Sequence, residues 1–290
     1  MMTFKEKCNA YYRLTKPGII RGNLITAAAG FLLAAKQDVP FERGILMLLG
    51  LGFIIASACV SNNILDRKLD KKMTRTVKRA LVSGSISVRG AAIFAAGLLL
   101  LGSLLLGIGT NVLALVTGLI GYVAYVAVYG YYKRRSTLGT AVGSISGAIP
   151  PVVGYVAVSG RIDTAAIILF AILVCWQMPH FFAIAVYRLK DYTAAELPVL
   201  PVKKGLTATK IQSLVYIVGY GLSSLALSAY DYTGIIYAVV MTVISLVWLG
   251  LATKGFYVKD NEAWARKLFF FSLIAITVQS ALIGANALLP

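Results

Sequence analysis

The chain has 290 residues, of which 59% are hydrophobic and 13% are charged, and its formal net charge is +17. A soluble domain rarely combines so high an apolar fraction with so few charges, so the composition excludes a soluble globular protein. A basic chain can bind nucleic acid, but these bases lie between long apolar stretches. They are therefore interpreted as loop anchors against anionic membrane lipids, with no nucleic-acid partner.

Nine apolar stretches, each of about 20 residues, are long enough to cross the hydrocarbon core of a bilayer. They cover residues 18–35, 44–65, 89–108, 111–132, 138–159, 163–187, 208–229, 233–252 and 268–288. The segments between them carry charge, Gly or Pro and are too short for a soluble domain. We therefore expect one all-α domain over residues 1–290, a polytopic membrane helical bundle.

The distribution of basic residues predicts the topology. An amino terminus in the cytoplasm places 25 of the 28 Lys and Arg residues on the inner side, with Lys36, Arg43 and Arg161 outside. The positive-inside rule requires such a bias, and nine spans then put the carboxyl terminus outside a bacterial cytoplasmic (inner) membrane. A cleavable signal peptide is the competing interpretation of the first stretch. We expect a retained helix, because the motif that ends the second stretch must return to the inner side.

A polar triad lies where the second apolar stretch ends, in the segment SNNILDRKLD. Asn62, Asp66 and Asp70 recur every four residues, so a continuous helix places them on one face, about 40° apart per step. Two carboxylates and an amide form a hard-oxygen site that suits Mg²⁺ bridging to a phosphate. The basic segment that follows indicates a diphosphate pocket at the membrane surface. Its candidate diphosphate ligands are Arg75, Lys78 and Arg79.

Further bases follow the fourth apolar stretch. Lys133, Arg134 and Arg135 are either topology anchors or contacts to a phosphate or propionate. The tyrosines before them form either an interfacial aromatic belt or a wall that stabilises a cation, because π-faces attract cations. These tyrosines are Tyr122, Tyr125, Tyr129, Tyr131 and Tyr132. In the next stretch, Pro150 and Pro151 predict a kinked helix.

The sixth apolar stretch ends in a second polar group. His180, Tyr187 and Asp191 fall at i, i+7 and i+11, which places them within about 20° of one helix face. Four spans separate Asn62 from His180, so both groups end on the same side of the membrane, as in a weak repeat of a four-helix unit. His180, the only histidine, is either a structural hydrogen-bonding group or a ligand. Asp191 alone could be a merely interfacial residue.

These motifs resemble the UbiA superfamily of intramembrane prenyltransferases and, within it, the family that farnesylates heme. The matching segments are LTKPGI (14–19), NNILDRKLD (62–70), RTVKRAL (75–81), YYKRRS (131–136), GAIPPVVGY (147–155), WQMPHFFAIAVYRLKDY (176–192) and LPVLPVKKG (197–205). The second motif departs from the superfamily pattern DxxxxxxDxxxD, because His180 and Tyr187 stand at two acidic positions. Asn63 likewise stands where many relatives carry Asp.

The resemblance implies farnesyl transfer from farnesyl diphosphate to a vinyl group of heme b, with hydration, giving heme O for a terminal oxidase. Asp66, Asp70, His180 and Tyr187 would be catalytic, with Asn62 completing a Mg²⁺ site. The other ligand residues implied are Arg75, Lys78, Arg79, Lys133, Arg134, Arg135 and Asp191.

Three other functions compete with this one. The nearest is a prenyltransferase that acts on an aromatic or quinone precursor, which the loss of acidic residues from the second motif disfavours. A transporter predicts polar residues through both halves of a pore, whereas charge here gathers at one end of the spans. A heme-binding protein without catalysis leaves the triad Asn62, Asp66 and Asp70 unexplained.

Overall fold

The computed structural model describes residues 3–74 and 76–288, and within these ranges the chain is helical and contains no strand. Nine segments of this described part are long and apolar enough to cross a membrane, which confirms the expected bundle. They are Pro17–Ala35 (α2), Phe41–Asp70 (α3), Val88–Gly109 (α5), Val112–Tyr132 (α6, η1 and α7), Gly139–Ser159 (α8 and α9), Thr164–Tyr187 (α10), Leu200–Ala229 (α12), Ile235–Lys254 (α13) and Asn261–Leu288 (α14).

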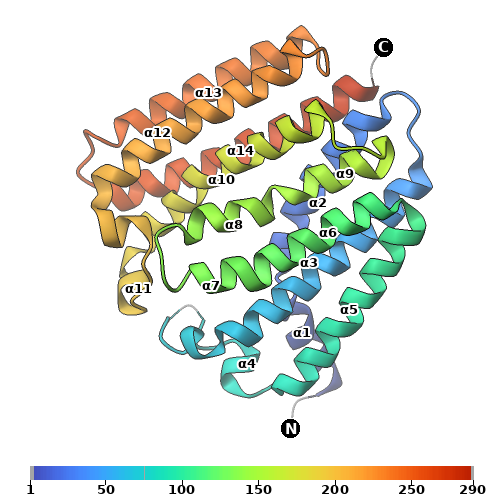
Figure 1. Cartoon of the computed structure of the whole chain (residues 1–290). Helices are drawn as coiled ribbons and strands as arrows, with labels where there is room; N and C mark the ends of the chain where they lie inside the picture. Colours follow the sequence, from blue (N-terminus) through green and yellow to red (C-terminus); the bar gives the residue numbers. More distant parts are fainter. Residues whose placement is uncertain (1–2, 75, 289–290) are drawn as a thin grey trace.

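Three short helices complete the fold, namely Phe4–Leu14 (α1), Ala80–Ser83 (α4) and Leu189–Ala194 (α11). All three lie at the end of the bundle that holds the amino terminus, whereas the carboxyl terminus lies at the opposite end (Figure 1). An odd number of crossings produces this arrangement. The end with the short helices is also where α3 and α10 finish, so the two polar motifs meet on one side of the bundle.

Helix contacts repeat along the chain at an interval of four spans. Helix α3 packs along α5, and four spans later α10 packs along α12. Helix α14 contacts both α2 and α10 and so joins the first half of the bundle to the second. These pairings agree with the four-helix repeat expected from the two polar motifs, with the ninth span added at the end.

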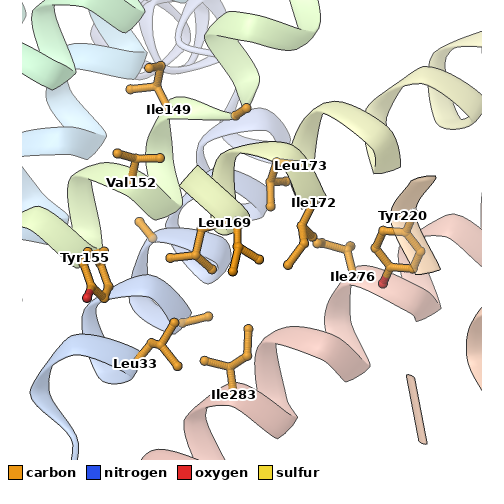
Figure 2. Packing of buried hydrophobic residues seen from close by; sticks show 14 of the residues in the cluster. Leu33, Ile149, Val152, Tyr155, Leu169, Ile172, Leu173, Tyr220, Ile276 and Ile283 are labelled. Atoms are coloured by element: carbon orange, nitrogen blue, oxygen red, sulfur yellow. The ribbon is translucent and has the colours of Figure 1, made fainter. Parts of the chain in front are cut away.

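The apolar core lies between α2, α9, α10 and α14. Leu33, Val152, Leu169, Ile276 and Ile283 come from these four helices and point toward one another (Figure 2). A cavity of about 10 Å³ between these four helices is roughly the size of one water molecule. The side chains therefore fill this part of the bundle almost completely, which holds the four helices rigidly relative to one another.

Two spans change their helical geometry in the middle. Span 139–159 breaks at Ala148, and α9 begins at Ile149 with Pro150 and Pro151 in its first turn; this confirms the expected kink at the proline pair. Span 112–132 contains a π-helical segment, Ala124–Tyr129 (η1), between α6 (Val112–Val123) and α7 (Gly130–Tyr132). Such segments are uncommon and occur frequently at functional sites. Nothing in the sequence pattern indicated this one.

Glycine allows α2 and α9 to approach until their backbones touch. A Cβ at Gly154 would collide with the carbonyl oxygen of Ala27, and a Cβ at Gly30 would collide with that of Pro151. Backbone atoms cannot rotate away as a side chain can, so the two helices would have to separate. We expect Gly154→Ala to lower the free energy of unfolding by about 1–3 kcal/mol through overpacking.

Thermal unfolding of the purified protein in detergent would measure this loss. Gly97→Ala is the matched control, because Gly97 is also helical and a Cβ there meets no atom within 4 Å. In open space, replacing Gly by Ala in a helix is neutral or slightly stabilising. Equal melting temperatures for the two variants would show that the α2–α9 contact does not depend on glycine.

Candidate active site

The last three turns of α3 carry polar side chains that are almost completely buried. The helix continues through Asp70, so Asn62, Asp66 and Asp70 lie along it as the spacing predicted. Their exposed fractions are 3%, 7% and 2%, and that of Asn63 is 3%. A buried carboxylate is costly unless cations or hydrogen-bond donors surround it. The partners of these four residues therefore define the site.

Two basic residues from the loop after α7 contact Asp66. Lys133 Nζ lies 2.5 Å from one carboxylate oxygen of Asp66, and an Arg134 guanidinium nitrogen lies 2.8 Å from the other. Lys133 also donates to Asn62 Oδ1 at 2.7 Å, so its ammonium lies between the amide and the carboxylate. Burial lowers the pKa of Lys133, while the charge of Asp66 acts in the opposite direction. These contacts join α3 to a segment about 70 residues further along the chain.

Arg79 compensates the negative charge of the second carboxylate, Asp70. One of its guanidinium nitrogens lies 2.7 Å from Asp70 Oδ2 and 3.2 Å from Asn63 Oδ1. The amide nitrogen of Asn63 donates to the Leu14 carbonyl oxygen at 2.9 Å. A carboxylate at position 63 could accept from Arg79 but could not donate to Leu14. Asn63 therefore ties the carboxyl end of α1 to the motif, which gives a physical reason for the departure from Asp.

Lys16 is a further cation of the site that sequence analysis did not single out. It precedes Pro17 in the left-handed conformation, at φ 54° and ψ 67°. A non-glycine residue rarely adopts this conformation, and a following proline favours extended backbone instead. Burial lowers the pKa of Lys16. The charge of Arg79 lowers this pKa further, whereas Cys59 and Asp66 act to raise it. Strained backbone beside a charged cluster is the signal that could have identified it, and this signal is visible only in the structure.

The tyrosines before Lys133 divide into two groups. Tyr125 and Tyr129 stack at 5.5 Å within η1, and Lys133 Nζ lies 5.1 Å from the Tyr129 ring centre. Tyr122 shares a hydrogen bond of 3.0 Å with Ser61 of α3. In contrast, Tyr131 and Tyr132 are exposed at the end of the span. Tyr125 and Tyr129 therefore lie where a cation-stabilising wall would need them, and Tyr131 and Tyr132 lie where an interfacial belt would need them.

Asp191 does not lie on the same helix face as His180 and Tyr187, so that prediction was wrong. Helix α10 ends at Tyr187, because Arg188 leaves the helical conformation at φ −110° and ψ 21°. Asp191 lies on α11 and accepts a hydrogen bond of 2.8 Å from Thr74 in the loop after α3. An apolar cluster packs α11 and the residues after it against the end of α3 and this loop. It contains Leu69, Met73, Tyr192, Ala195, Leu197 and Val199.

His180 and Tyr187 do share a face, and that face packs against α14. The imidazole stacks on Trp176 at 4.8 Å and lies 4.8 Å from the Phe269 ring centre. Its Nδ1 is 2.7 Å from Ser272 Oγ. The Tyr187 ring contacts the same Phe269 edge-on at 5.7 Å. These residues therefore form an aromatic group separate from the cluster of Asp66 and Asp70.

The remaining predicted ligands lie in different surroundings. Arg135 points away from Asp66, stacking on the Tyr131 ring at 3.9 Å and donating to the Tyr131 carbonyl oxygen. Lys78 is exposed on the loop after α3. Arg75 lies outside the described residues. Of the predicted cations that the structure describes, Lys133, Arg134 and Arg79 are thus the three that contact the carboxylates.

The oxygen atoms on α3 suit a divalent cation. Among the described residues no group of three His, Cys, Asp or Glu side chains forms a closed metal site. However, Mg²⁺ in phosphate-binding sites commonly takes only one or two carboxylates, and the phosphates supply further ligands. Asn62 Oδ1 and Asp66 Oδ2 already converge on one cation, the Lys133 ammonium. The donor set therefore fits a magnesium ion bound together with a diphosphate.

The fold and the polar ends of α3 and α10 are those of an integral membrane prenyltransferase. The chain belongs to the UbiA prenyltransferase family, whose model matches residues 23–274. It is 47% identical over 290 residues to the protoheme IX farnesyltransferase of Citrobacter koseri, covering 100% of this chain and 97% of the relative. The protein of the same name from Klebsiella pneumoniae is 48% identical over 281 residues, covering 97% and 95% of the two chains.

Solved structures share the fold at lower identity. A structure of a digeranylgeranylglyceryl phosphate synthase superposes with a TM-score of 0.81 at 20% identity, covering 98% of this chain and 99% of that one. A UbiA homolog from Archaeoglobus fulgidus bound to GPP and Mg²⁺ gives a TM-score of 0.68 at 16% identity, covering 95% and 99%. Both similarities establish the architecture of the bundle.

Proposed function

We propose that this protein transfers the farnesyl group of farnesyl diphosphate to a vinyl group of heme b and that hydration then gives heme O. The observation that carries this proposal is the 47% identity, over the full chain, to proteins named protoheme IX farnesyltransferase. The site agrees with it, since an anion-binding cluster and a separate aromatic histidine group can serve two different substrates. The product would supply a heme-copper terminal oxidase.

The diphosphate would bind at the carboxylate end of α3. Asn62, Asp66 and Asp70 would hold Mg²⁺, which when bound neutralises diphosphate oxygens and favours their departure. The UbiA homolog with the same fold was solved with GPP and Mg²⁺, which supports the binding of a prenyl diphosphate together with Mg²⁺. Lys133, Arg134 and Arg79 already lie within 2.8 Å of the carboxylates, so they can exchange one anionic partner for another as the leaving group develops charge.

Loss of diphosphate leaves an allylic cation that free water would capture. The stacked rings of Tyr125 and Tyr129 lie beside Lys133, where their π-faces can stabilise positive charge and exclude water. The electron-rich vinyl carbon attacks this cation, and water adds to the new cation beside the pyrrole. His180 or Tyr187 would contact the heme or accept the proton that this water loses.

Mass spectrometry of the heme extracted after incubation tests the function. Purified protein, heme b, farnesyl diphosphate and Mg²⁺ should give a product heavier than heme b by one farnesyl group and one hydroxyl. A parallel incubation with 4-hydroxybenzoate in place of heme tests the rival acceptor class. Prenylated hydroxybenzoate with unchanged heme would overturn the proposal in favour of an aromatic acceptor.

We further propose that the protein lies in the bacterial inner membrane with its amino terminus in the cytoplasm. The bias of 25 basic residues against 3 and the opposite placement of the chain ends support this orientation. Single cysteines introduced near Thr3 and Asn286, in a background without Cys8, Cys59 and Cys175, should react with a membrane-impermeant thiol reagent from opposite sides. Labelling of both from one side would contradict nine crossings.

A further inference from the structure

Ser272 connects two aromatic side chains of α10 to α14. Its hydroxyl oxygen lies 2.7 Å from His180 Nδ1, and its backbone carbonyl accepts the indole N–H of Trp176 at 2.7 Å. Ser272 is fully buried, whereas His180 is half-buried. The imidazole lies between the indole of Trp176 and the ring of Phe269, so packing fixes its plane. One residue of α14 thus holds both His180 and the ring that stacks on it.

The hydrogen bonds of Ser272 determine which nitrogen of His180 carries the proton. A serine hydroxyl has one hydrogen to donate. Ser272 donates that hydrogen to the Phe269 carbonyl oxygen at 2.5 Å, because a carbonyl can only accept. Toward His180, the same oxygen can offer only a lone pair. Nδ1 of the neutral imidazole must therefore be the protonated nitrogen, and Nε2 must carry the free lone pair.

Histidines that bind metals usually have this arrangement. Such a histidine donates its other ring N–H to a fixed acceptor, which sets the tautomer, orients the ring and makes the ligating nitrogen more basic. In His180 the chain of hydrogen bonds runs from Nδ1 through Ser272 Oγ to the carbonyl of Phe269. Within residues 3–74 and 76–288, Nε2 makes no hydrogen bond in return.

Positive charge lies further along the same face. Tyr187 is seven residues after His180, roughly 10 Å along the helix axis. Two guanidinium groups lie against its ring, Arg188 at 5.4 Å and Arg266 at 5.2 Å. Both are at least two-fifths exposed, and their ion pairs with Asp191 and Glu262 are at the surface, where such pairs are weak. A planar dianion with a central metal fits this combination of one lone-pair nitrogen and two outlying cations.

We propose that Ser272 is a positioning residue that holds His180 with Nε2 directed at the iron of the heme substrate. The inference rests on the proposed function, because it assigns the acceptor of that reaction to the His180 side of the site. Binding forms an Fe–Nε2 bond and displaces whatever weak ligand the free heme carries. Ser272 acts through His180 and does not itself touch the heme.

Resonance Raman spectroscopy of the protein with ferrous heme b tests this directly. The wild type should show an iron–histidine stretching band, and His180→Ala should lack it. Ser272→Ala should lower its frequency, since the ligand loses the hydrogen bond at Nδ1, and should weaken heme affinity about 10- to 100-fold. Ser213→Ala is the matched control, because Ser213 is also buried and its hydroxyl donates to the backbone of its own helix, at Thr209.

The outcomes separate this inference from the proposed function. A band that persists in His180→Ala, or that Ser272→Ala leaves at the wild-type frequency, overturns the inference. Wild-type protein that makes farnesylated heme without an iron–histidine band overturns it as well and leaves the proposed function standing. Wild-type protein that shows the band but never prenylates heme supports the ligand assignment and refutes the proposed function.

Discussion

Replacing Asp66 by Asn should abolish prenyl transfer while the protein still inserts and folds. The substitution keeps the shape of the side chain and removes the charge that Lys133 and Arg134 contact at 2.5 and 2.8 Å. Without that charge the site holds a metal–diphosphate complex poorly, and the two cations lose their anionic partner. Loss of one such electrostatic contact typically costs on the order of 100-fold or more in rate. Product formation by the purified variant would measure it.

Asp70→Asn should have a comparable effect, because Asp70 is the partner of Arg79. Asp163→Asn is the matched control. Asp163 is also ion-paired, with Arg161 at 3.0 Å, but it caps α10 at the other end of the bundle, and Asn is an equally good cap. EDTA should inhibit the wild type as strongly as either substitution. Turnover that survives EDTA, or that survives in Asp66→Asn, would eliminate the metal from the mechanism.

His180→Ala should retain affinity for farnesyl diphosphate and lose heme O formation. The imidazole is packed between Trp176 and Phe269, apart from the carboxylate cluster, so its removal leaves the diphosphate contacts unchanged. A residue that takes part in the reaction should reduce the rate on the order of 100-fold or more when removed. Diphosphate affinity and product yield, measured on the same preparation, would show the two effects separately.

His180→Gln distinguishes a reacting histidine from a structural one. Glutamine can still hydrogen-bond to Ser272, so a purely structural histidine should be replaced at a cost of about 0.5–1.5 kcal/mol in stability and with little change in rate. A near-normal yield of heme O from both variants would return His180 to a packing role. It would also remove the argument that the second motif is adapted to heme.

The sequence predicted the features that depend on local pattern. Nine spans follow from the length of each apolar stretch, and the shared face of Asn62, Asp66 and Asp70 follows from a helix that does continue to Asp70. The break before Pro150 follows from the chemistry of proline. Each of these depends on residues that are neighbours in the chain, where helical geometry alone fixes the outcome.

The features that sequence analysis missed depend on contacts between distant segments. Arg188 ends α10 although neither Gly nor Pro stands there, because the following residues pack against the loop after α3. Lys133 and Arg135 are two residues apart and indistinguishable in the sequence, yet only Lys133 reaches Asp66. Lys16 joins the site through a left-handed backbone. The hydrophobic periodicity of the sequence cannot predict such contacts, since each partner lies far along the chain.

The ammonium of Lys133 neutralises the negative charge of Asp66 at the carboxyl end of α3. A free divalent ion that approaches Asn62 and Asp66 has to expel a tethered cation that already contacts both oxygens, and the expelled group would be left buried beside a second positive charge. A metal that arrives with a diphosphate brings a new anion to which the lysine can turn. On the proposed function, the site would therefore bind the ion together with its substrate in preference to the ion alone, because only the complete complex would offer Lys133 a new anionic partner.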